Sequence, residues 1–217
     1  MMTPIQTTAD PRQLDSEVEK RVDDLLVQMT LSEKIGQMTQ VEKNSIKKGD
    51  IAKLAIGSIL SGGGGNPVPN TPENWREMVN GFIAESLESR LKIPLIYGSD
   101  CVHGHNNCHG ATIFPHNVGL GAADDEQIVE DIAAATAMEM KATGVRWNFA
   151  PAVSLPLDLR WGRSYEGFSQ DPETISKMAA AYVRGLIQGD MTVGVLPSVK
   201  HFVADGAAEW GTSKRIS

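Results

Sequence analysis

The sequence predicts an α/β fold, built as a partial (β/α)8 TIM-type barrel that contains about the first four βα units. Four short apolar runs alternate with helical patterns along the chain. The runs are apolar throughout, which is typical of parallel strands covered on both faces. Polar clusters follow the strands, where (β/α)8 barrels place their ligands. We therefore expect residues 1–217 to form the N-terminal part of a single (β/α)8 domain that is incomplete at its C-terminus, since residues 214–217 add no closing helix.

Two helical patterns precede the first predicted strand. Residues 16–29 carry apolar side chains at helical spacing and begin with Ser16 and Glu19, which have the form of a capping box. A second capping box, Thr30 with Glu33, opens a short helix that includes Met38. Residues 42–48 are predicted to form a loop or a helix end. Residues 51–54 are predicted to form a further helical turn.

The four predicted strands are separated by three longer helices. We expect the strands at residues 56–61, 93–97, 145–153 and 193–199. The helices begin at Thr71, at Asp124 or Asp125, and at Asp171, because these side chains are good N-caps. Gly144 is a natural stop for the second helix. Its core-facing side chains are predicted to be Ile128, Ile132, Ala135 and Met138.

The composition suits a globular chain whose partners are neutral and polar. Hydrophobic residues make up 41% of the 217 positions, which is enough for a sizeable core. The net charge of −7 is spread along the sequence, which argues against nucleic-acid and anionic-membrane partners. No apolar run is long enough for a membrane span, and residues 1–11 lack a signal-peptide pattern. The default expectation is a cytoplasmic chain, with a periplasmic or secreted parent protein as the alternative.

The sequence favours neither a metal nor a cofactor. The sequence leaves open whether Cys101 and Cys108 form a disulfide or remain two reduced thiols. The absence of a secretion signal favours the reduced thiols. Together, His103, His105, His109 and Cys108 suggest zinc, but their spacing matches no structural zinc pattern. The glycine run at residues 62–65 lacks the Lys-Ser/Thr ending of a phosphate-binding loop.

Asp100, His103 and His105 come just after the second predicted strand, so their side chains are expected in the crevice at the carboxyl edge of the sheet. A carboxylate there can accept two hydroxyl protons from one sugar. The competing interpretation is structural: Asp100 caps a local turn, and the histidines satisfy buried backbone groups.

Two further polar clusters follow the third and fourth strands. Arg160 and Arg163 flank a tryptophan, and a guanidinium fork suits neighbouring hydroxyls while an indole offers an apolar face to a sugar ring. Ion pairs with Asp158 or Glu166 are the structural alternative, and we expect one arginine of each kind. The last cluster, after a buried strand, consists of Lys200 and His201.

Several strings in this order resemble the family 3 glycoside hydrolases, and the nearest branch is that of the β-glucosidases and exo-β-glucanases. The resemblance covers nearly everything from about residue 18 to residue 206. The strings are Gly-Ser-Ile-Leu-Ser-Gly-Gly-Gly (57–64), Tyr-Gly-Ser-Asp-Cys-Val-His-Gly-His-Asn-Asn (97–107), Thr-Ile-Phe-Pro-His-Asn (112–117), Asn-Phe-Ala-Pro-Ala-Val (148–153), Arg-Trp-Gly-Arg-Ser-Tyr-Glu (160–166) and Lys-His-Phe-Val-Ala-Asp-Gly (200–206).

The resemblance implies a retaining enzyme that hydrolyses O-glycosyl bonds of β-glucosides from the non-reducing end. The implied partner is a β-linked glucose oligosaccharide or glucoside, with no cofactor. The residues that match the −1 sugar subsite of the family are Asp100, Arg163, Lys200 and His201.

The resemblance also implies that the catalytic carboxylates are missing from this chain. The family nucleophile is an Asp, usually in a Ser-Asp-Trp string that does not occur here, so it is expected downstream of Ser217. Retaining hydrolysis needs two carboxyl groups about 5 to 5.5 Å apart. We expect the isolated chain to be inactive and to associate through open sheet edges. The alternatives are a non-catalytic carbohydrate-binding or interaction module and a complete small hydrolase, but the latter lacks a Gly-x-Ser-x-Gly elbow.

Overall fold

The computed structural model describes residues 16–189, 193–202 and 205–207. Within these residues the strands are β1 (Gln40–Glu42), β2 (Ser58–Ser61), β3 (Ile96–Ser99), β4 (Trp147–Asn148) and β5 (Leu196–Pro197). The helices are α1 (Ser16–Leu26), α2 (Leu31–Met38), α3 (Asp50–Leu54), α4 (Pro72–Ser86), α5 (Asn117–Ala123), α6 (Glu126–Ala142), α7 (Pro172–Ile187) and the 3-10 helix η1 (Ser164–Glu166). The expectations that concern residues 1–11 and 214–217 lie outside the described residues.

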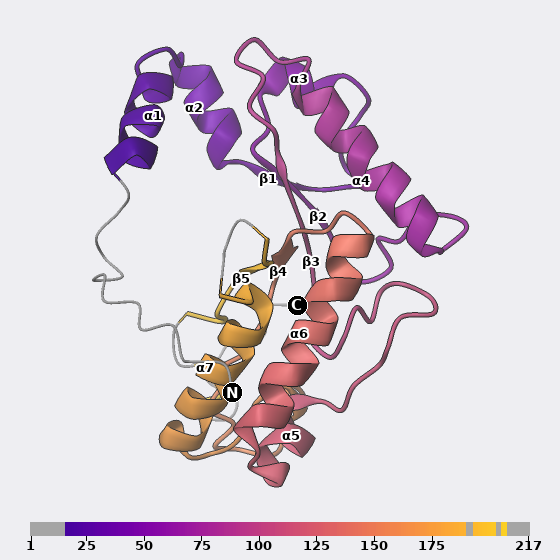
Figure 1. Cartoon of the computed structure of the whole chain (residues 1–217), viewed down its shortest axis with the longest axis vertical. Coiled ribbons are helices and arrows are strands. Elements are labelled where there is room, and N and C mark those ends of the chain that lie inside the picture. Colours follow the sequence, from indigo (N-terminus) through magenta and orange to yellow (C-terminus); the bar gives the residue numbers. More distant parts are fainter. Residues whose placement is uncertain (1–15, 190–192, 203–204, 208–217) are drawn as a thin grey trace.

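The strands form one open parallel sheet whose order, β1-β2-β3-β4-β5, follows their order along the chain. Parallel connections cross over with a right-handed sense, so helices that link successive neighbours cover the same face. A doubly wound sheet would instead reverse its strand order. The predicted α/β class and the partial TIM-type barrel are therefore confirmed (Figure 1).

The described residues contain one strand more than the four predicted. Gln40–Glu42 form β1, where two polar residues of three give no apolar run to detect. The strand expected at 145–153 is also much shorter than predicted, since only Trp147–Asn148 join the regular ladder. Pro151 has no N–H to donate, and pairing resumes only at a bridge between Ala152 and Lys200.

The two faces of the sheet differ in their surroundings. Ile59 and Tyr97 are neighbours in register, and they expose 0% and 2% of their surface beneath the helices. The opposite, inner face carries one row of register partners, Glu42, Leu60, Gly98, Trp147 and Leu196. Leu60 and Trp147 are only partly buried. Within the described residues this inner face is therefore less completely covered than the expectation of cover on both faces requires.

Helices α6 and α7 lie side by side and form the most extensive helix contact of the described residues (Figure 1). Each is capped by a carboxylate, Asp125 for α6 and Asp171 for α7. The helices approach closely at Gly185, where a Cβ would lie 2.2 Å from the carbonyl oxygen of Glu130. Large side chains of α7 fill the core beneath this contact, among them Met178, Tyr182 and Leu186.

The start of α6 and its buried face correct two details of the prediction. Asp125 is the N-cap, whereas Asp124 ends the unpredicted helix α5 in a left-handed conformation. Ile132 is buried as expected, but Ile128 and Met138 expose 46% and 60% of their surface. The buried face is rotated toward smaller side chains, Val129, Ala133, Thr136, Ala137 and Met140, because α7 packs closely there.

Helix α4 follows the prediction at its start and ends earlier than expected. The Thr71 side chain accepts a hydrogen bond from the Asn74 N–H, and Pro72 begins the helix. Trp75 and Val79 are fully buried. The helix ends at Ser86, and tight turns rather than helix continue to Arg90.

Helices α1 and α2 carry an apolar face that is not covered by other described residues. The capping box of Thr30 and Glu33 forms as predicted, and Arg90 pairs with Glu33 at 2.7 Å. Helix α1 has no buried residue. Val27 and Leu31 expose 84% and 75% of their surface. Neither helix crosses a membrane: within the described chain, no helix is both long and apolar enough for that.

Candidate functional site

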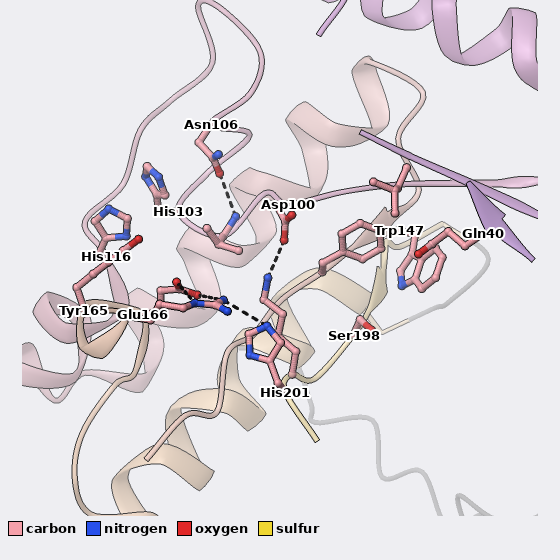
Figure 2. A pocket seen from close by; sticks show the side chains of 15 residues that line it. Gln40, Asp100, His103, Asn106, His116, Trp147, Tyr165, Glu166, Ser198 and His201 are labelled. Atoms are coloured by element: carbon pink, nitrogen blue, oxygen red, sulfur yellow. Dashed lines mark hydrogen bonds and ion pairs between the residues drawn. The ribbon is translucent and has the colours of Figure 1, made fainter. Parts of the chain in front are cut away.

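Asp100, Arg163, Lys200 and His201 line one depression with a volume of about 720 Å³ (Figure 2). Asp100 directly follows β3, Arg163 lies in the loop after β4, and the other two residues follow β5. Since the strands are parallel, their carboxyl ends meet at one edge of the sheet. The four residues predicted from the sequence are thus brought together, although up to 101 positions separate them along the chain.

Lys200 and Asp100 form an ion pair at the centre of the depression. The Lys200 Nζ lies 2.6 Å from Asp100 Oδ1. The lysine side chain is 17% exposed and the aspartate side chain 43% exposed. The backbone places this lysine, because Lys200 donates its N–H to the carbonyl of Pro151 and accepts from Val153. An ammonium and a carboxylate side by side can donate to and accept from neighbouring hydroxyl groups of one ligand.

Arg163 is held by Glu166 through two hydrogen bonds. The Nε–Oε1 and Nη2–Oε2 distances are 2.6 and 2.7 Å. Burial raises the pKa of Glu166, but the hydrogen bonds and charge of Arg163 outweigh burial, and the net shift is downward. Glu166 therefore stays ionised and fixes the plane of the guanidinium group. The remaining guanidinium edge reaches His201, with Nη2 3.3 Å from Nε2.

The second ring nitrogen of His201 faces the acidic side chain of Asp205. Nδ1 lies 2.8 Å from Asp205 Oδ2, and the Ser154 hydroxyl donates to the same oxygen at 3.0 Å. Ser154 is buried, with 1% of its surface exposed. Both ring nitrogens of His201 are therefore fixed by neighbours on the protein.

One wall of the depression consists of three rings in contact with one another. His103 and His116 have ring centroids 4.2 Å apart, and Tyr165 meets His116 edge to face at 4.7 Å (Figure 2). Burial and the neighbouring His116 lower the pKa of His103, so its imidazole is neutral at neutral pH. The His103 Nδ1 atom is buried without a protein partner.

The opposite wall is apolar and comes from β4 and the residue that follows it. Trp147 and Phe149 meet edge to face, with ring centroids 4.9 Å apart. Gly98 makes room for them, since a Cβ there would lie 2.4 Å from the Phe149 ring and 3.1 Å from Trp147. An apolar wall facing charged and polar groups is the arrangement that binds sugar rings, which have one less polar face and a rim of hydroxyls.

Other polar residues singled out in the sequence lie elsewhere. His105 is fully buried in the core and bonds to the side chains of Cys101 and Thr143, so its role is structural, but its partners are side chains rather than the backbone groups expected. Arg160 pairs with Asp158 and does not line the depression. Cys101 and Cys108 are both buried free thiols. No group of three or more potential metal ligands occurs within the described part of the chain.

Several lining residues were not singled out from the sequence. They are Gln40, His116, Trp147, Phe149, Tyr165 and Ser198. Glu166 was considered only as an ion-pair partner, which it is, but it also lines the depression. The signal for His116, Trp147 and Tyr165 was present, because all three lie in or next to the strings that carry the family resemblance.

The family assignment follows from comparison with known proteins. The family model of the glycosyl hydrolase family 3 N-terminal domain matches residues 30–215. The chain belongs to glycoside hydrolase family 3. Among curated relatives, the lysosomal beta glucosidase of Dictyostelium discoideum is 38% identical over 187 residues, which cover 78% of this chain and 23% of that protein. The periplasmic beta-glucosidase of Salmonella typhimurium is 35% identical over 195 residues, covering 88% of this chain and 24% of the relative.

Solved structures of an exo-beta-glucanase and of a beta-glucosidase share the fold of this chain. The exo-1,3/1,4-beta-glucanase of a Pseudoalteromonas species superimposes with a TM-score of 0.85 and 38% identity, over 92% of this chain and 26% of that one. The beta-glucosidase of Listeria innocua, determined in one mutant form with laminaribiose, gives a TM-score of 0.68 and 29% identity, over 90% and 28% of the two chains. This family 3 chain spans about a quarter of the length of the two curated relatives described above.

Proposed function

We propose that this chain supplies the sugar-binding side of the active site of a retaining β-glucosidase-type glycoside hydrolase, which releases glucose from the non-reducing end of β-linked glucosides. The convergence of Asp100, Arg163, Lys200 and His201 on one depression carries the proposal. Family membership supports hydrolysis of glycosidic bonds, and the names of the relatives support β-glucosides as the substrate class.

Each of the four residues has a distinct role in this proposal. Asp100 accepts hydrogen bonds from neighbouring hydroxyls of the terminal glucose, and Lys200 donates to them. Arg163 and His201 contact the hydroxyls on an adjacent part of the ring. A sugar held by two such pairs is fixed in orientation, which lowers the barrier for a correctly placed attacking group.

The attacking carboxylate and the acid/base carboxylate come, in this proposal, from polypeptide outside residues 1–217. Both carboxylates in the depression are already ion-paired, Asp100 with Lys200 and Glu166 with Arg163. A paired carboxylate is a poor nucleophile because its charge is stabilised by its partner. The same observation supports the second candidate, in which the chain binds carbohydrate without cleaving it. The cytoplasmic location stays a prediction.

The test measures sugar binding and turnover by residues 1–217. We expect titration with methyl β-glucoside to give saturable binding, and an aryl β-glucoside to remain intact at high protein concentration. Asp100→Ala removes charge-assisted hydrogen bonds of about 1.5 to 3 kcal/mol, so affinity should fall more than tenfold. The matched control is Asp24→Ala, an exposed aspartate on α1 outside the depression.

Two results would contradict the proposal. One is equal affinity of the Asp100→Ala variant and the unaltered chain, which would remove Asp100 from the sugar site. The other is turnover of the aryl glucoside by a monodisperse monomer, which would show that the attacking carboxylate lies within residues 1–217.

A further inference from the structure

His201 is held on both of its ring nitrogens, and the two partners are of opposite kind. Nε2 lies 3.3 Å from Nη2 of Arg163, and Nδ1 lies 2.8 Å from Oδ2 of Asp205. A guanidinium group has only donors, and a carboxylate has only acceptors. Both contacts are therefore hydrogen bonds only if Nε2 accepts and Nδ1 donates.

This pair of contacts selects one form of the imidazole. The Nδ1–H tautomer satisfies both partners, with its lone pair on Nε2 facing Arg163. The Nε2–H tautomer would place two donors against each other at Arg163 and two acceptors against each other at Asp205. The doubly protonated ring would keep the bond to Asp205 and lose the one to Arg163.

Asp205 is itself fixed on the side away from the depression. The Ser154 hydroxyl donates to the same Oδ2 atom at 3.0 Å, and the carbonyl of Asp205 accepts from the Leu155 N–H at 2.9 Å. The next residue, Gly206, has a φ of +81° and leaves no room for a Cβ, which would lie 2.6 Å from the Trp161 ring. Asp205 does not line the depression, so it acts through His201.

We propose that Asp205 is a positioning residue that keeps His201 in the Nδ1–H tautomer, so that Nε2 offers its lone pair to a sugar hydroxyl whose oxygen accepts from Arg163. The sugar part of this inference rests on the proposed function. A hydroxyl is both donor and acceptor, and it can replace the direct contact between Arg163 and His201 without leaving either group unpaired. The other tautomer would present a second donor beside Arg163 and favour an acceptor-only ligand atom.

The tautomer can be measured directly by NMR on residues 1–217 labelled with 15N-histidine. The chain has five histidines, and the signals that disappear in the His201→Gln variant are those of His201. We expect Nε2 of His201 to resonate as an unprotonated ring nitrogen and Nδ1 as a protonated one. In Asp205→Ala the fraction of the Nε2–H tautomer should rise, because Nδ1–H loses its acceptor and free histidine prefers Nε2–H in water, while Arg163 alone still favours Nδ1–H. The signals of buried His105 should stay unchanged and so report an intact core.

Asp205→Asn is the conservative variant that separates positioning from folding. One oxygen of Asp205 accepts both hydrogen bonds, so the single amide oxygen of Asn can accept both as well. We expect the Asn variant to keep the Nδ1–H tautomer that the Ala variant loses in part. An Nε2–H tautomer in the unaltered chain, or an unchanged tautomer in Asp205→Ala, would overturn the inference.

Binding of methyl β-glucoside tests the functional half separately. Affinity should fall about tenfold in Asp205→Ala and recover in Asp205→Asn. If the Ala variant changes the tautomer but binds the sugar as tightly as the unaltered chain, the role of Asp205 in binding is refuted while the sugar site stands. If the unaltered chain binds no glucoside, the proposed function fails, and the tautomer spectra still decide whether Asp205 positions His201.

Discussion

Arg163 illustrates how far the role of a single residue can be predicted from the sequence. The sequence indicated that one of the two arginines in the Arg-Trp-Gly-Arg string is structural, and the structure shows Arg160 on Asp158 and Arg163 in the depression. The sequence offered an ion pair with Glu166 only as the alternative to a functional role, whereas Arg163 both pairs with Glu166 and lines the depression. The sequence did not indicate that Asp205 lies behind His201. These contacts depend on loop conformation, which no periodicity in the sequence encodes.

We predict that Arg163→Lys weakens methyl β-glucoside binding about tenfold. A lysine ammonium is a point charge, and it cannot keep the two bonds to Glu166 together with the contact to His201. Arg160→Lys is the control, because Arg160 pairs with Asp158 outside the depression. Isothermal titration of both variants tests the difference, and equal losses would contradict a role that is specific to Arg163.

His105 should make the stability of the fold depend on pH. Burial lowers the pKa of His105 to about 4. The unfolded chain, with a histidine pKa near 6.5, therefore binds more protons than the folded chain between these values. The contribution of neutral His105 to the free energy of unfolding is fully present above about pH 6.5. It is lost as the pH drops toward 4, which lowers the free energy of unfolding by on the order of 3 kcal/mol. Urea unfolding at several pH values measures this loss, and the His105→Gln variant should show a flatter dependence.

At the level of elements, caps and long apolar faces were predictable and short elements were not. Thr71, Asp125 and Asp171 cap helices at expected positions because each has a side-chain oxygen that accepts from the first turn. Strand β1 and helix α5 were missed, because a three-residue strand with two polar side chains and a helix with two glycines carry little local signal. Their conformations depend on tertiary packing.

The contact between α6 and α7 depends on the absence of a side chain at one position. Gly185→Ala would place a Cβ 2.2 Å from the Glu130 carbonyl oxygen and 2.7 Å from the Ala133 Cβ. We expect a loss of about 1 to 3 kcal/mol in the free energy of unfolding, because the helices must separate. Gly81→Ala on α4 is the matched control, since its Cβ would meet nothing within 4 Å. It should be neutral or stabilising by up to about 1 kcal/mol. Chemical denaturation of both variants decides the matter.

At the scale of the whole molecule, exposed apolar side chains gather on and beside α1 and α2. Leu31 and Met38 on α2 expose 75% and 80% of their surface, and Val27, in the turn just after α1, exposes 84%. Figure 1 shows these two helices standing apart from α6 and α7. Apolar surface gathered in this way promotes association.

We predict that residues 1–217 self-associate in a concentration-dependent manner. Val27→Glu should weaken association, because it places a charge in the exposed apolar face of α1 and α2. Val118→Glu changes a valine that is 51% exposed on α5, away from that face, and serves as the control. Sedimentation velocity over a range of concentrations measures the effect, and equal behaviour of both variants would exclude this face as the site of association.

The order of the strands has a consequence for the way in which the chain acquires its structure during synthesis. Each strand pairs only with the strand that comes before or after it, so every step of sheet growth joins a new segment to one already in place. Pairing between neighbours along the chain lets each βα unit add to the sheet as the chain emerges from the ribosome, although every parallel connection must first close a crossover that contains at least one helix. The depression, however, needs both Asp100 after β3 and His201 after β5. A nascent chain therefore carries most of its core before it has a place for any ligand.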